Sequence, residues 1–275
     1  MSSILNNSSA SVALATLNNI NKDLNETQNR VSSGLAISSG KDNAAYFAIS
    51  ETMSGDSGMY SAISEGLTST INSVSTARLG AETVSGLAEQ FASRVAFAQG
   101  NGVSLADVQA ELDGMVDQIS AAIDQSTFNG EDLVSSAAPA TVDVVTGISR
   151  ASGAFATTTV TFSTVNLTAI RDTLDAIDLT TSTDLQADLA TAEGALGDAI
   201  SAATSLGVTE GTLESQQDFL SSLTDTLDSG ISAMVDANME EEAARLQAYQ
   251  VQQQLATQSL SIANQSPQNI LSLFQ

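Results

Sequence analysis

The sequence predicts a mainly α-helical protein: a long antiparallel helical bundle, a coiled-coil pair formed by the N- and C-terminal segments, and a small β-hairpin insertion. Three observations support this prediction. Apolar residues recur in alternating steps of three and four over most of the 275 residues, which is the spacing of packed helices. Proline, which interrupts helices, occurs only twice. One segment in the middle instead alternates apolar and polar residues, as strands do.

The first predicted helix covers residues 4–34. Its apolar stripe keeps the alternation without a break and consists of Ala10, Ala13, Leu17, Ile20, Leu24, Thr27 and Val31. Gly34 follows where a glycine often ends a helix. A disordered tail would not keep such a register, so we expect an ordered amphipathic helix.

Three further helices are predicted at 43–98, 104–127 and 185–234, and they can bury their stripes against one another in a rod-like bundle. The stripe of the first comprises Ile63, Leu67, Thr70, Val74, Ala77, Ala81, Val84, Ala88, Phe91, Val95 and Ala98. The stripe of the last runs from Leu185 to Met234 and keeps three polar members, Glu210, Gln217 and Thr224.

The segment from about residue 140 to 165 does not follow the helical spacing of apolar residues. Val142, Val144 and Ile148, and then Val160 and Phe162, alternate with polar residues around two glycines. This pattern predicts a β-hairpin. A threonine-rich stretch of this kind is also typical of a loosely ordered surface insertion, and the sequence leaves that alternative open.

The last predicted helix covers 243–272. Its stripe contains Ala244, Ala248, Val251, Leu255 and Ile262, with Gln258 in the remaining slot. We expect this stripe to pair with that of residues 4–34. Residues 1–42 plus 235–275 then form a terminal helical domain, and residues 43–234 form the rod-like bundle domain.

The charge is unevenly distributed. The whole chain has eight basic and 32 acidic residues, but residues 1–42 are neutral and residues 243–275 contain only Arg245. Like charges cannot be pressed together at low dielectric. Neutral ends on an acidic middle therefore predict self-association through the ends, with the middle kept in water.

The composition argues against catalysis. Cysteine and histidine are absent, which removes thiolate and imidazole chemistry and the usual zinc ligands, so we expect no enzyme activity, cofactor or metal site. The run Glu240–Glu242 is interpreted as a solvated turn that leads into the last helix. A net charge of −24 disfavours nucleic-acid binding. No segment predicts a signal peptide or a membrane-inserted helix.

Three motifs resemble those of bacterial flagellins, in particular the short alphaproteobacterial flagellins without outer variable domains. They are LNETQNRVSSGLAI with KDNAA at residues 24–45, STFNG at 126–130, and EEAARL with ANQSPQNILSLF at 241–274. The resemblance implies a structural subunit that is exported without a cleaved signal. It would polymerise into the extracellular flagellar filament used for swimming.

The resemblance also implies partners and assembly residues. The partners would be further copies of the chain, the flagellar export apparatus, an export chaperone, the filament cap and hook-junction proteins. The expected assembly residues are Leu17, Ile20, Leu24, Val31, Ala244, Ala248, Val251, Leu255, Ile262, Ile270 and Leu273.

The sequence leaves two other functions open: a hook–filament junction protein, and a coiled-coil adaptor or adhesin that only dimerises. One departure from the family pattern is also informative. In flagellins sensed by the vertebrate toll-like receptor, the helix that aligns with residues 87–96 has Arg and Leu at contact positions. This chain has Glu89 and Ser93 there, which predicts poor receptor activation.

Overall fold

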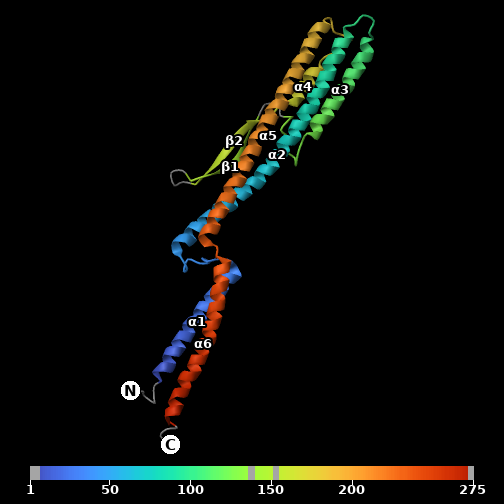
Figure 1. The fold of residues 1–275 in the computed structure, drawn as a ribbon. Helices are drawn as coiled ribbons and strands as arrows, with labels where there is room; N and C mark the ends of the chain where they lie inside the picture. The colour runs from blue at the N-terminus through green and yellow to red at the C-terminus, as the bar shows by residue number, and fades with distance from the viewer. Residues whose placement is uncertain (1–6, 136–139, 151–154, 272–275) are drawn as a thin grey trace. The chain divides into compact units, whose positions relative to one another are not determined.

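The computed structural model describes residues 7–135, 140–150 and 155–271 (Figure 1). The helices and strands are α1 (Ser8–Ser33), α2 (Ala44–Ala98), α3 (Leu105–Gln125), β1 (Thr141–Ser149), β2 (Ala156–Ser163), α4 (Leu167–Asp175), α5 (Leu185–Val235) and α6 (Met239–Leu271). The predicted fold class, mainly helical with one small antiparallel hairpin, is confirmed.

The chain forms two compact units. One combines Met1–Ser57 with Asp225–Gln275 and is called the terminal unit below; the other, Gly58–Thr224, is called the central unit. Helices α2 and α5 run through both ranges. The division predicted from sequence, at residues 42 and 235, differs from these bounds and stays a prediction about function.

The core of the central unit follows the predicted stripes. On α2, every stripe residue from Val74 to Ala98 is buried, with Phe91 fully enclosed. On α3, Val108, Leu112 and Ile119 are buried as well. Many of these positions are alanine, which lets helices approach closely although each alanine buries little area.

Two of the three polar members of the α5 stripe, Glu210 and Gln217, have partners on α2. Glu210 accepts a hydrogen bond from Arg78 Nε at 2.5 Å, and Gln217 Nε2 donates to Thr68 Oγ1 at 2.6 Å. The hydrogen bond from Arg78 to Glu210 contributes most to raising the pKa of Arg78, and Glu82 adds to it. These two pairs fix the antiparallel register of α2 against α5. The predicted stripes alone do not determine that register, because apolar residues repeat along both helices.

Helix α4 was not predicted. Asn166 caps it, because its side-chain oxygen accepts a hydrogen bond from the Ala169 backbone N–H at 2.9 Å. Leu167, Ile170 and Leu174 are buried and pack α4 against α3. The helix is only nine residues long, so its stability comes from this packing.

The β-hairpin is ordered and tied to both long helices, which decides against a loosely ordered insertion. Tyr60 of α2 donates to the Ile148 carbonyl at 3.3 Å, and Gln216 of α5 donates to the Thr146 carbonyl at 3.1 Å. The pairing of β1 with β2 is antiparallel, with an irregularity between Val145 and Gly147.

Candidate assembly surface

The terminal unit is built around the antiparallel pair of α1 and α6. Two polar contacts fix its register: Gln253 Nε2 donates to Asn21 Oδ1 at 2.6 Å, and Arg30 lies 3.6 Å from Glu242. At the end of α1, Gly34 adopts φ of 76° and its N–H bonds the Arg30 carbonyl. Backbone bonds join the residues that follow α1 to those that precede α6, including Ala36 N–H to the Val235 carbonyl at 2.7 Å.

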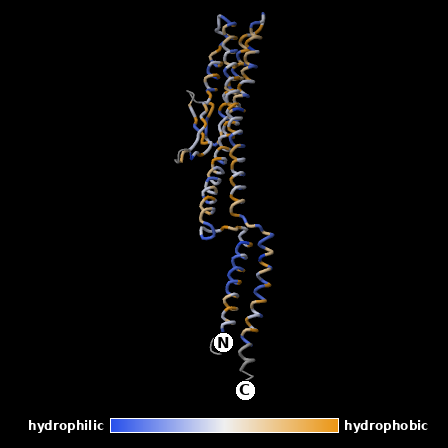
Figure 2. Tube along the Cα trace, turned by 60° about the vertical axis from the view of Figure 1, so that its left-hand side comes forward, coloured by the Kyte–Doolittle hydropathy of each residue, from blue (hydrophilic) through white to orange (hydrophobic). Residues whose placement is uncertain are grey.

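The predicted stripe of α1 is the face that packs on α6. Leu24 is buried, and Leu17, Ile20 and Val31 are half-buried along the same face. Apolar residues recur along both helices (Figure 2). These four candidate residues therefore hold the pair together within one chain.

The predicted pairing is wrong for α6. The face of α6 against α1 consists of Glu242, Leu246, Tyr249, Gln253, Ala256, Leu260 and Ala263, which are buried or half-buried. Ala244, Ala248, Val251, Leu255 and Ile262 each lie one or two positions from this face, and such an offset turns a helical side chain by about 100° or 200°. The apolar period pointed to the wrong stripe because the packed one includes Glu242 and Gln253, whose partners Arg30 and Asn21 make it compatible with burial.

The predicted α6 stripe is left exposed in the single chain. Val251 is 55% exposed, Leu255 59% and Ile262 69%, and Ala244 and Ala248 are exposed beside them. Ile270 lies in α6, but its side chain is outside the described part of the structure, and Leu273 lies outside the described residues.

A groove of about 490 Å³ runs between the two helices next to this stripe. It is lined by Ser9, Val12, Ala13, Thr16 and Ile20 of α1 and by Gln252, Leu255, Ala256 and Ser259 of α6. No charged side chain lines it, since residues 1–21 and 246–275 contain none. Val12 is 67% exposed at its rim.

The helix pair thus has an open apolar stripe beside segments without charged side chains, residues 8–21 and 246–271, and exposed apolar surface of this kind is typical of association sites. The N-terminal helical region of bacterial flagellin matches residues 4–138, and the C-terminal helical region matches residues 189–274. A flagellin of Brucella melitensis is 36% identical over 283 residues, covering 100% of both chains. The chain is a bacterial flagellin.

Other flagellins also match along the whole of this chain. Flagellin FljM of Caulobacter vibrioides is 32% identical, covering 100% of this chain and 99% of its own, and flagellin C of Rhizobium meliloti is 32% identical, covering 100% of both. Flagellins are structural, non-enzymatic subunits of the extracellular flagellar filament. The filament-subunit function is thereby preferred over the junction protein and the dimeric adaptor.

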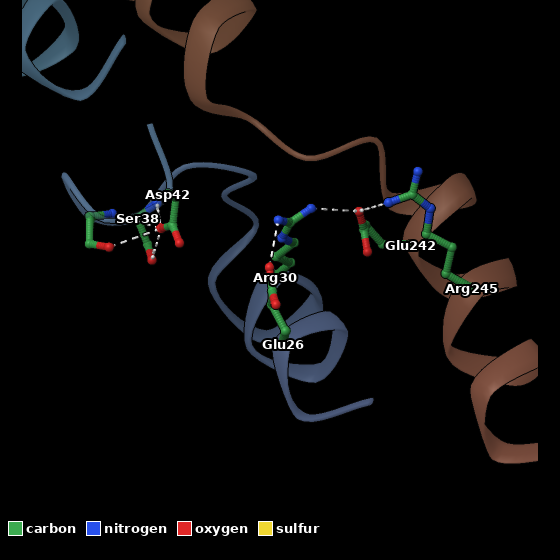
Figure 3. A network of polar contacts seen from close by, with 7 residues as sticks. Glu26, Arg30, Ser38, Asp42, Glu242 and Arg245 are labelled. Atoms are coloured by element: carbon green, nitrogen blue, oxygen red, sulfur yellow. Dashed lines mark hydrogen bonds and ion pairs between the residues drawn. The ribbon is translucent and has the colours of Figure 1, made fainter. Parts of the chain in front are cut away.

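Four charged residues of the terminal helix pair form one network in this flagellin: Glu26 and Arg30 of α1, and Glu242 and Arg245 of α6 (Figure 3). Arg30 contacts Glu26 at 2.9 Å and Glu242 at 3.6 Å, and Arg245 contacts Glu242 at 3.5 Å. The Glu242 side chain is only 7% exposed, and its Oε2 has no hydrogen-bond partner in the described structure. The run Glu240–Glu242 is thus the first turn of α6, with one buried member, and the prediction of a solvated turn is wrong for Glu242.

A second polar turn follows α1. The Asp42 carboxylate accepts hydrogen bonds from the backbone N–H and the hydroxyl of both Ser38 and Ser39, at 3.0–3.3 Å. The backbone N–H of Ser38, followed by the Ser39 hydroxyl, holds the pKa of Asp42 below its ordinary value. These bonds order the chain between α1 and α2.

Within the described ranges, no three acidic side chains gather as a metal site would require. Among those same residues, no helix combines the length and apolar character needed to cross a bilayer.

Proposed function

We propose that the exposed stripe of α6 is the surface through which this flagellin meets its neighbours in the filament core. The stripe is Ala244, Ala248, Val251, Leu255 and Ile262. The single observation that supports this proposal best is its exposure: large aliphatic side chains stay more than half open on a helix whose other face is packed. Burying the exposed part of each large side chain against a neighbouring copy would contribute about 1 kcal/mol to the free energy of association.

The charge pattern supports the same proposal. In a polymer, a charged side chain at this surface would meet its own copies with little water between them. Residues 1–21 and 246–275 avoid this cost because they contain no charged side chain. The four α1 residues Leu17, Ile20, Leu24 and Val31 act indirectly in this proposal, by holding α1 against α6 so that the stripe is presented. The roles of Ile270 and Leu273 rest on the terminal motif alone.

In this proposal residues 1–42 with 235–275 form the filament core and residues 43–234 form the layer in contact with water. The acidic charge of the middle segment suits that layer, because net charge favours solubility. The finer partners that the family suggests, namely export apparatus, export chaperone, filament cap and hook-junction proteins, belong to the same proposal.

The test compares two matched leucine variants in seeded polymerisation followed by sedimentation and negative-stain microscopy. Leu255 on α6 is 59% exposed and Leu79 on α2 is 62% exposed. Leu255→Asp should raise the critical concentration more than about 100-fold, because lost apolar burial and a buried charge together cost about 3 kcal/mol or more. Leu79→Asp should polymerise nearly as wild type does. Equal loss in both variants, or none in Leu255→Asp, would overturn the assigned surface.

A further inference from the structure

Both lysines of the chain line one groove of the terminal unit. The groove has a volume of about 460 Å³ and lies between α1 and the loop that follows it. Its lining comprises Lys22, Asn25, Glu26, Asn29, Arg30, Lys41 and Asp42. Lys22 and Lys41 are the only lysines in 275 residues, and both are exposed.

The carboxylates of this groove already have partners. Glu26 pairs with Arg30 at 2.9 Å, and Asp42 is held by four hydrogen bonds from Ser38 and Ser39. Neither lysine ammonium has a carboxylate within salt-bridge distance in the part of the chain that the structure describes. Five arginines, in contrast, are ion-paired: Arg30, Arg78, Arg94, Arg171 and Arg245. The groove therefore presents two cations that are free to bind an acidic partner.

The flagellin itself supplies such a partner. The central unit contains four basic and 21 acidic residues, a net charge of −17, whereas the terminal unit has a net charge of −7. In a filament, neighbouring copies present these carboxylates at high effective concentration. A cationic groove facing them would gain attraction and relieve part of the repulsion between acidic surfaces.

We propose that Lys22 and Lys41 form a docking groove for carboxylates on the central unit of a neighbouring copy. This inference rests on assembly into a filament, and it adds a polar contact to the apolar one assigned to α6. Lysine suits the task because its ammonium sits on a long flexible stem and can reach carboxylates whose positions shift as the filament bends.

The first test is zero-length carbodiimide cross-linking, which joins an amine to a carboxylate in direct contact. Filaments are grown from an equal mixture of ¹⁴N and ¹⁵N chains, so that peptides joined between subunits show mixed isotope masses. We expect mixed-isotope links from Lys22 or Lys41 to acidic residues of Gly58–Thr224, present in filaments and absent from monomers. Filaments whose lysine links are all within one chain, to residues such as Glu26 or Asp42, would overturn the proposal.

The second test measures critical concentration in variants matched for net charge. Lys22→Gln with Lys41→Gln should raise it about tenfold, as expected for the loss of two exposed ion pairs. The control, Thr157→Glu with Thr159→Glu, changes the net charge by the same amount at exposed positions of β2. It should change the critical concentration less than about twofold. Lys22→Arg with Lys41→Arg should assemble as wild type.

Salt separates this contact from the apolar one. The tenfold difference should shrink toward none at about 1 M ionic strength, where the Debye length is about 3 Å. If wild-type chains polymerise and the glutamine variant matches them at low salt, the lysine groove is refuted while the α6 surface stands. If wild-type chains form no filaments at all, the assembly proposal itself fails.

Discussion

Gly80 offers a sharp test of how α2 packs in the central unit. A Cβ placed on Gly80 would lie 1.8 Å from Ser126 Oγ and 2.5 Å from Ser126 Cβ, whereas one placed on Gly86 meets nothing within 4 Å. Ser126 is buried and its hydroxyl donates to the Ala122 carbonyl. Gly80→Ala must therefore push α2 away from the segment after α3 and break this bond.

The expected magnitudes follow from these distances. Overpacking costs about 3 kcal/mol and the lost hydrogen bond about 1 kcal/mol, while alanine gains about 1 kcal/mol in helix propensity. Gly80→Ala should thus destabilise the protein by about 3 kcal/mol, and Gly86→Ala should stabilise it by about 0.5–1 kcal/mol.

Urea unfolding followed by circular dichroism measures both changes. With a slope of about 2 kcal/mol/M, Gly80→Ala should lower the midpoint by about 1.5 M. Adding Ser126→Gly removes both atoms that clash and should restore most of the loss. Two alanine variants of equal stability would refute the close approach of α2 to Ser126.

Three further outcomes are expected. Arg30→Ala removes one of the two cations beside the buried Glu242 carboxylate and should destabilise the α1–α6 pair by about 1–2 kcal/mol. Amide exchange over residues 8–33 should then be faster, and adding Glu242→Gln should recover part of the lost stability. Asp42 has a lowered pKa, so its stabilisation is present above about pH 4 and is lost as pH falls through that pKa; Asp42→Asn should flatten the acid dependence of unfolding below about pH 4. Glu89 and Ser93 are exposed on α2, and we expect this flagellin to give little signal in cells that report activation of the toll-like receptor. Replacing Glu89 with Arg and Ser93 with Leu should raise the signal. A strong response to the wild-type protein would contradict the expectation.

Much of the fold could be predicted because long helices repeat their packing pattern many times. The α2 stripe from Val74 to Ala98 is buried at every predicted position, since each step of three or four residues confirms the same register. Helix α4 has only nine residues, so its packing pattern repeats at most twice. Its signals were Asn166 as a cap and the spacing of Leu167, Ile170 and Leu174, and they are too few to stand out after a hairpin.

The candidate surface shows what periodicity cannot decide. Two stripes of α6 keep the same alternation, and the more apolar one is left exposed in the single chain. The packed stripe contains Glu242 and Gln253, whose burial becomes acceptable only once Arg30 and Asn21 are placed opposite them. The apolar pattern of the sequence therefore identifies a stripe of α6 that is favourably buried. It does not tell whether the stripe packs within the same chain or against another copy.

The most direct test of the assigned surface uses the absence of cysteine from the chain. A single thiol would be introduced as Leu255→Cys on the α6 stripe or as Thr157→Cys on the exposed edge of β2, and its labelling rate compared in monomers and in filaments. Both thiols should react readily in monomers, because both sites are exposed. In filaments we expect labelling at Leu255→Cys to slow by more than about tenfold while Thr157→Cys keeps its rate. Equal labelling of Leu255→Cys in monomers and in filaments would contradict the assignment of this stripe to the contact between subunits.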